Sequence, residues 1–250
     1  MTRVGTRGGS GGRSIGSAAV TAAWLAFGLA LAAPAHAGSF KVNPVQLNLL
    51  ADRQSASLKL TNSDSAPVSV RVATFAWTQV DGSDVYTPTI NVIASPPIFT
   101  IPPGETQIVR IGLRNRAGPR AYRVILEEIP RDQPVKGQVQ ITLKLNLPLY
   151  VLPKGRANAE LAWAAWRDGS GDMIVEGRNR GSLHGQIVEL AADQGGRRHI
   201  LSNQMGVVLP GSARQWKIGK RPDLAVGAPL MLRVKGPAGE TQTQIVLERR

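Results

Sequence analysis

The sequence contains no cysteine, so it can form no disulfide bond, no cysteine-ligated zinc site and no thiol nucleophile. Aromatic residues make up only 5% of the chain, although 42% of all residues are hydrophobic and can supply a core. Beyond residue 37 the only histidines are His184 and His199, and neither has a carboxylate or a second histidine at ligand spacing. We therefore expect both histidines to be surface or packing residues, and we expect no metal or other cofactor.

Motifs for catalysis are also missing. Residues 12–16 match the nucleophile pattern G-x-S-x-G, but no strand precedes them. Glu127 and Glu128 are adjacent, and neighbouring residues of a strand point to opposite faces, so the two carboxylates cannot share one site. No glycine-rich loop with a lysine suggests phosphate binding. The sequence thus predicts a binding protein and not an enzyme.

Acidic residues are outnumbered by basic ones, and the formal net charge is +13. Such a balance suits nucleic acid or an acidic protein partner. The basic residues are scattered, however, mostly alternate with apolar ones, and never form a run of five. This spacing argues against a nucleic-acid-binding protein.

The first 37 residues have the pattern of a secretory signal peptide. A basic start with Arg3, Arg7 and Arg13 precedes an apolar run over residues 18–33. Ala35-His36-Ala37 is an A-x-A site, which predicts cleavage after Ala37. The alternative is a membrane anchor, but the apolar run is shorter than the ~20 residues that span a bilayer. We expect an exported soluble product.

From residue 38 onward the sequence is strand-like. Candidate strands recur at roughly ten-residue spacing with turn signals such as Asp81-Gly82 between them, and no helical period is present. This pattern is typical of an all-β sandwich or barrel. Residues 153–156 (P-K-G-R) form the expected boundary between two domains, residues 38–154 and 155–250.

One stretch is unusual. Residues 139–151 read V-Q-I-T-L-K-L-N-L-P-L-Y-V, with an apolar side chain at every second position, which places the apolar set on one face of a strand. At ~3.3 Å per residue this strand would extend roughly 40 Å. One interpretation is a strand with one face in its own core. The other is that part of the row is an open edge, which invites pairing with another chain.

Particular stretches match a known family. In the first half they are residues 68–79 (V-S-V-R-V-A-T-F-A-W-T-Q), 95–104 (S-P-P-I-F-T-I-P-P-G), 106–111 (T-Q-I-V-R-I), 122–130 (Y-R-V-I-L-E-E-I-P) and 145–151 (L-N-L-P-L-Y-V). A shorter match in the second half is V-L-P-G-S-A-R-Q-W at residues 208–216. These stretches resemble the periplasmic chaperones of the chaperone–usher pilus pathway, and their archaic, spore-coat-like branch most closely.

The resemblance implies a fold, a location and partners. It implies two immunoglobulin-like β-sandwich domains in an L-shaped (boomerang) arrangement, with residues 139–151 as the last, or G, strand of the first domain. Members of the family act in the periplasm, bind pilus subunits that lack their own last strand, lend them the G strand, and deliver them to an outer-membrane usher. By register, the expected donor side chains are those of Val139, Ile141, Leu143, Leu145 and Leu147.

The resemblance also implies an anchor for the terminal carboxylate of the subunit. Other members use an arginine on the first strand and a lysine on the G strand, but alignment places Gln46 and Pro148 at those positions. Neither residue carries a positive charge, and a carboxylate in a cleft favours a cationic partner. Lys144 and then Arg123 are the candidate replacements.

Two other functions are weighed against this one. A structural pilus subunit would have an N-terminal donor extension and one incomplete domain, whereas this chain runs from Gly38 almost directly into a strand. A secreted carbohydrate-binding or hydrolytic protein would need clustered exposed aromatics or paired acids. An exposed apolar edge also favours self-association of the free protein.

Overall fold

The structure is a computed structural model that describes residues 40–50, 52–117, 120–130 and 141–250. The expected signal peptide (residues 1–37) and the expected donor Val139 lie outside these ranges. Residues from Gly38 to Arg250 form one compact unit. No helix within the described ranges is long and apolar enough to cross a membrane.

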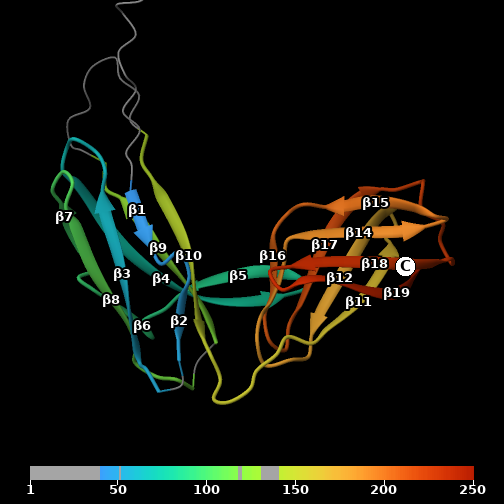
Figure 1. Cartoon of the computed structure of the whole chain (residues 1–250), viewed down its shortest axis with the longest axis horizontal. Helices are drawn as coiled ribbons and strands as arrows, with labels where there is room; N and C mark the ends of the chain where they lie inside the picture. Colours follow the sequence, from blue (N-terminus) through green and yellow to red (C-terminus); the bar gives the residue numbers. More distant parts are fainter. Residues whose placement is uncertain (1–39, 51, 118–119, 131–140) are drawn as a thin grey trace, which may run out of the picture. The chain divides into compact units, whose positions relative to one another are not determined.

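Every regular element in the described ranges is a β-strand, so the predicted all-β fold is confirmed (Figure 1). The first ten strands are β1 (Phe40–Asn43), β2 (Leu47–Leu49), β3 (Ser55–Asn62), β4 (Val68–Val80), β5 (Ser83–Pro88), β6 (Val92–Ser95), β7 (Ile98–Ile101), β8 (Thr106–Leu113), β9 (Ala121–Glu128) and β10 (Lys144–Val151). We refer to β1–β10 as the first sandwich.

The first sandwich consists of two sheets around one core. The strand orders are β1-β3-β8-β6 in one sheet and β2-β10-β9-β4-β5 in the other, where β7 also pairs with β4. Apolar side chains from both sheets fill the space between them, among them Leu58 and Val109 from one sheet and Val124 and Leu149 from the other. The alternation that predicted these strands is the same alternation that fills this core.

The second sandwich holds the remaining strands. They are β11 (Leu161–Arg167), β12 (Asp172–Asn179), β13 (Gly185–Ile187), β14 (Glu189–Gln194), β15 (Arg197–Ser202), β16 (Gly206–Val208), β17 (Ala213–Lys220), β18 (Pro229–Gly236) and β19 (Gly239–Arg249). A seven-stranded sheet has the order β15-β14-β18-β19-β11-β12-β17, and β13 pairs with β16. Its separate core includes Met173, Leu190, Trp216 and Leu232.

Each sandwich has a buried asparagine at the end of one strand. Asn62 ends β3 and is fully buried, and its amide donates to the carbonyls of Ala66 (2.8 Å) and Ile101 (3.0 Å). Asn179 ends β12 and is 1% exposed, and its amide donates to the carbonyls of Leu183 (2.7 Å) and Val208 (3.0 Å). Each asparagine thus satisfies backbone groups that burial would otherwise leave without partners.

The predicted boundary at residues 154 and 155 stays a prediction. No strand pairing joins β1–β10 to β11–β19 within the described ranges. The chain from Gly38 to Arg250 nevertheless holds together as one compact unit, because the β4–β5 hairpin contacts the second sandwich. Gln79 Oε1 accepts from the backbone N–H of Leu209 (2.9 Å), and its Nε2 donates to the carbonyl of Val207 (2.7 Å).

The long strand is shorter than the sequence predicted. β10 begins at Lys144, residues 141–143 are described but are not part of a strand, and residues 139–140 lie outside the described ranges. The neighbour β9 ends at Glu128, and Pro130 soon follows with no N–H to offer. Residues 141 and 142 therefore have no β9 residue opposite them.

Candidate functional site

The N-terminal half of β10 has one open edge. On one side β10 pairs with β9 from Lys144 to Tyr150. On the other side β2 pairs with β10 in parallel, but only at Leu149–Val151. Among the described residues, no strand lies against that side of β10 from Lys144 to Pro148. A row of backbone N–H and C=O groups is available there for another strand.

The apolar side chains along this segment differ in exposure. Ile141 is 69% exposed, Leu143 and Leu145 are half-buried, and Leu147 is 7% exposed. Leu147 belongs to the core of the first sandwich, and Leu145 packs against that core. The single apolar row of the sequence is therefore divided: its C-terminal part completes the core of this protein, and its N-terminal part does not.

A cross-strand row of charges lies on the outward face beside the open edge. Glu127 is directly opposite both Arg71 on β4 and Lys144 on β10. Its carboxylate binds Lys144 Nζ at 2.7 Å and Arg71 Nη2 at 2.8 Å, and these hydrogen bonds lower the pKa of Glu127. Lys144 is largely exposed, but its charge already has a partner in this state.

Arg123 lies deeper on the same face. It is opposite Pro148 on β10, and its guanidinium carbon lies 3.8 Å from the ring centroid of Trp77 and 5.6 Å from that of Tyr86. Its Nε is buried and has no hydrogen-bond partner in the described part of the chain. Arg123 forms no ion pair within the described ranges, so its charge can attract an anion that approaches this face. Gln46, at the other aligned position, donates to Asn48 at 3.2 Å.

Aromatic rings extend this face toward the second sandwich. Tyr150 stacks on His184 with ring centroids 3.6 Å apart and an interplanar angle of 7°. Trp77, Ala121 and Tyr150 form an apolar cluster with Leu209 of the second sandwich. Burial raises the pKa of Tyr150 to about 12 and lowers the pKa of His184 below its usual value of 6.5.

Asp84 on β5 organises the polar side of this junction. Its carboxylate accepts from Trp77 Nε1 (2.9 Å) and Gln79 Nε2 (2.8 Å), and it forms an ion pair with Arg214 of the second sandwich. Burial by itself would raise the pKa of Asp84. The hydrogen bonds from Gln79, Arg214 and Trp77 outweigh burial and hold this pKa below its usual value.

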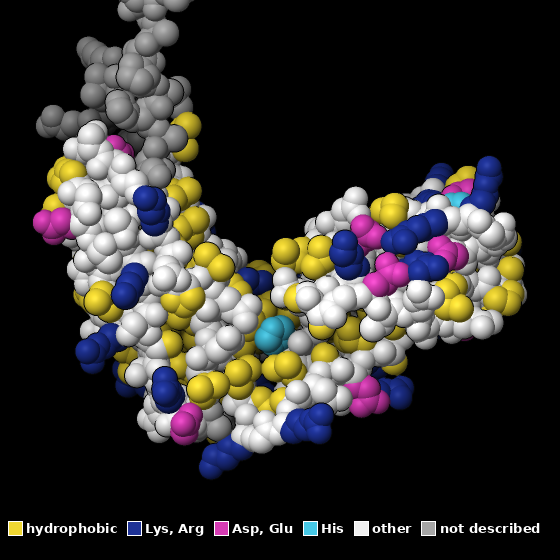
Figure 2. All heavy atoms as spheres, in the orientation of Figure 1, with side chains coloured by type: hydrophobic (Ala, Val, Ile, Leu, Met, Phe, Trp, Pro, Cys, Tyr) yellow, Lys and Arg dark blue, Asp and Glu magenta, His cyan; other side chains and the backbone are white. Residues whose placement is uncertain are grey.

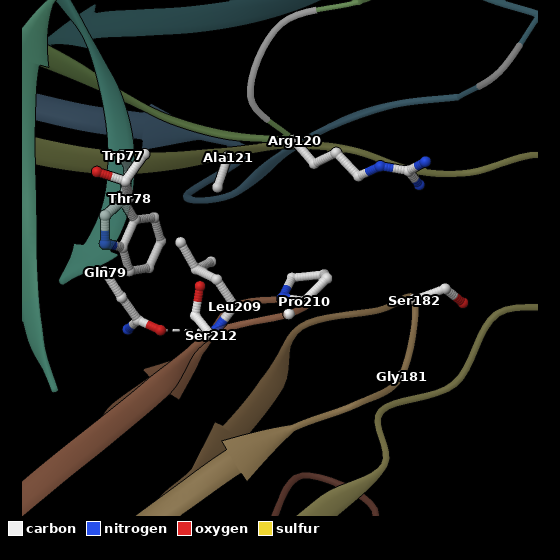
Figure 3. A pocket seen from close by; sticks show the side chains of 11 residues that line it. Trp77, Thr78, Gln79, Arg120, Ala121, Gly181, Ser182, Leu209, Pro210 and Ser212 are labelled. Atoms are coloured by element: carbon white, nitrogen blue, oxygen red, sulfur yellow. Dashed lines mark hydrogen bonds between the residues drawn. The ribbon is translucent and has the colours of Figure 1, made fainter. Parts of the chain in front are cut away.

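A cavity of about 660 Å³ lies behind this junction (Figure 3). Its lining includes Trp77 and Leu209, with the Gln79–Leu209 hydrogen bond at its edge (Figure 3). The side chains of Arg120 and Ser182 point away from Trp77 (Figure 3). The cavity offers space but no converging set of charged groups.

The two histidines and the tryptophans of the described chain have packing or hydrogen-bond partners. His184 packs on Tyr150, which fits the packing role predicted for it. His199 pairs with Asp223 at 2.9 Å, a carboxylate that spacing in the sequence did not place beside it. The four tryptophans at positions 77, 163, 166 and 216 are buried or packed against a core, as predicted. Figure 2 shows basic side chains scattered over the visible face and not gathered into one patch. The aromatic stack was not predicted, because its partners are distant in sequence.

Part of this chain matches a known protein family. Residues 39–157 match the family described as pili and flagellar-assembly chaperone, PapD N-terminal domain. No curated protein sequence matches the chain.

Solved structures match most of this chain. One is the CsuC–CsuE chaperone–tip adhesion subunit pre-assembly complex from the archaic chaperone–usher Csu pili of Acinetobacter baumannii, with a TM-score of 0.63 and 20% identity over 85% of this chain and 99% of that one. Another is the SafA pilin in complex with the SafB chaperone from Salmonella enterica (0.58, 15%, 86% and 99%). A third is the CupB2 chaperone of Pseudomonas aeruginosa (0.53, 14%, 83% and 100%).

The fold is that of the two-domain, immunoglobulin-like pilus chaperones. Residues 39–157 match the PapD-like pilus chaperone family, and the chain shares the fold of the solved pilus chaperones, so the resemblance predicted from the sequence is confirmed. This is a family of chaperones and not of enzymes.

Proposed function

We propose that this protein is a periplasmic chaperone that stabilises pilus subunits by strand donation from β10 and delivers them to an outer-membrane usher. The observation that carries the proposal is the open edge of β10 from Lys144 to Pro148, preceded by the exposed Ile141. The neighbours solved as complexes with a tip subunit or a pilin support the choice of partner. The signal-peptide pattern of residues 1–37 supports the periplasmic location.

The donor residues follow from exposure. Ile141 and Leu143 precede the open edge of β10, and Leu145 lies on it. None of the three is fully buried, so a subunit groove can receive them. Val139 would continue the same row. We leave Leu147 out, because it already fills the core of the first sandwich. Each buried aliphatic side chain contributes roughly 1.5–3 kcal/mol before the cost of ordering both chains.

The anchor for the terminal carboxylate is best assigned to Arg123. Lys144 would have to leave Glu127, which lies 2.7 Å away, whereas Arg123 has a buried Nε without a partner in the described part of the chain. Arg123 is also opposite Pro148, the position where related chaperones carry a lysine. This assignment places the cationic group on β9, next to β10, and on the same face of the sheet.

Co-purification tests strand donation. The mature chain would be produced in the periplasm with the pilus subunit encoded beside it, as wild type and as Ile141→Asp plus Leu143→Asp. Thr142→Asp is the matched control, because Thr142 lies between the two donors and would point to the other face once the donated segment pairs as a strand. We expect a stoichiometric complex with wild type and Thr142→Asp, and none with the double variant, which should remain folded. A complex that survives the double variant would place the binding surface elsewhere.

A further inference from the structure

The carboxylate of Glu128 binds the backbone of Leu143, the residue just before β10. Glu128 Oε2 accepts a hydrogen bond from the backbone N–H of Leu143 at 3.0 Å. The backbone N–H of Glu128 in turn donates to the carbonyl of Leu143 at 2.9 Å. One residue of β9 therefore satisfies both backbone groups of Leu143, and it uses its side chain for one of them.

This arrangement marks the place where β10 leaves the sheet. In a regular antiparallel ladder the N–H of Leu143 would bond to a main-chain carbonyl. With a side-chain oxygen as acceptor, the regular pairing begins only at Lys144 and Glu127. Ile129, the residue after β9, donates its N–H to the carbonyl of Ser69 on β4 and not to the β10 segment. Glu128 is thus the last tether before Ile141.

Glu128 can accept from the backbone of Leu143 because Glu127, and not Glu128, pairs with the cations beside the open edge. Glu127 points to the outward face and binds Lys144 and Arg71, whereas Glu128 has no ion pair among the described residues. The two carboxylates act on opposite faces of β9, as strand geometry requires. Their separation provides a matched control.

We propose that Glu128 is a positioning residue for strand donation: it fixes Leu143 so that Ile141 and Leu143 are presented to a subunit in a defined register. The inference rests on the proposed function. Without the carboxylate, the N–H of Leu143 loses its acceptor within the described chain, and residues 141–143 gain conformational freedom that binding must remove. Holding the segment in place before binding lowers that cost.

Amide hydrogen exchange of the free protein and subunit binding test the proposal together. In Glu128→Ala we expect exchange at Leu143 to accelerate at least about tenfold and subunit affinity to fall about three- to tenfold. Glu128→Gln keeps an oxygen acceptor and should restore most of both. Glu127→Gln should leave exchange at Leu143 unchanged.

The outcomes separate this inference from the proposed function. Unchanged exchange in Glu128→Ala would overturn the tether, and faster exchange with unchanged affinity would overturn its role in binding. A Glu128→Gln protein as impaired as Glu128→Ala would contradict the hydrogen-bond account. If even the wild type binds no subunit, the proposed function fails, while the exchange data still report on the tether.

Discussion

β10 and β19 are the last strands of their sandwiches and pair in the same way. Each pairs antiparallel with another strand along most of its length, β10 with β9 and β19 with β18. Each also pairs in parallel with an early strand over only three residues at its C-terminal end, at Leu149–Val151 and Leu247–Arg249. Both strands therefore have an open edge in their N-terminal part, within the described ranges.

The two edges differ in chemistry. The segment that leads into β10 carries Ile141 and Leu143, whereas β19 begins with the exposed polar sequence G-E-T-Q-T-Q. Polar and charged residues on an edge discourage pairing with other chains, and apolar ones invite it. Topology creates an open edge twice in this molecule, and composition makes only one of the two suitable for an apolar groove.

Alanine substitutions along β10 and β19 test where the core ends on each strand, and they should have the largest consequences. Leu149→Ala and Leu247→Ala each remove a fully buried side chain and should cost about 2–5 kcal/mol of unfolding free energy. Ile141→Ala should change it by less than about 0.5 kcal/mol, because Ile141 is exposed. Urea unfolding measures all three. A loss in Ile141→Ala as large as in Leu149→Ala would mean that the apolar row is core throughout.

The next effect concerns the cation beside the edge. Arg123 is opposite Pro148 on β10, whereas the residue opposite the corresponding Val246 on β19 is Pro229, which carries no charge. Arg123→Ala should weaken subunit binding about ten- to hundredfold through lost charge-assisted bonds, and Lys144→Ala less than about threefold. Titration with purified subunit measures both.

A modified subunit completes that test. A subunit extended by one residue at its C-terminus should lose affinity for the wild type and become insensitive to Arg123→Ala. Equal losses from Arg123→Ala and Lys144→Ala, or an extended subunit still sensitive to Arg123→Ala, would contradict the assignment of the anchor to Arg123.

The smallest effect concerns the outward face at the C-terminal end of each strand. On β10 this position is Tyr150, which stacks on His184; on β19 it is Glu248, which binds Arg250 at 3.1 Å. His184→Ala should cost about 0.5–1.5 kcal/mol of unfolding free energy. His199→Ala, which removes the pair with Asp223 but no ring stack, is the control.

The stability that the Tyr150–His184 stack contributes should also depend on pH. Burial lowers the pKa of His184 in the folded state, so the unfolded chain binds a proton first as pH falls through 6.5. Stability should therefore be full above pH 6.5 and decrease below it. His184→Phe, measured by thermal unfolding between pH 5 and 8, should flatten that decrease. An equal pH dependence in His184→Phe would assign the effect to another group.

Local patterns in the sequence predicted the fold well. The period-two alternation located β4, β8, β9 and β10, and Asp81-Gly82 forms the predicted turn with positive φ at both residues. The pattern could not separate Ile141 from Leu147, because both belong to the same alternation and only the end of β9 decides which is covered. Tyr150–His184 and Glu128–Leu143 depend on chain segments that meet only after folding, so neither contact leaves a signal in spacing.

The continuity of β10 has a mechanical consequence. A subunit held through residues 141–145 would be attached to the same backbone that carries Leu147 and Leu149 into the first sandwich. A pull along that backbone would load the β10–β9 pairing in shear. The cross-strand hydrogen bonds from Lys144–Glu127 to Tyr150–Ala121 would then resist together and would not open one after another.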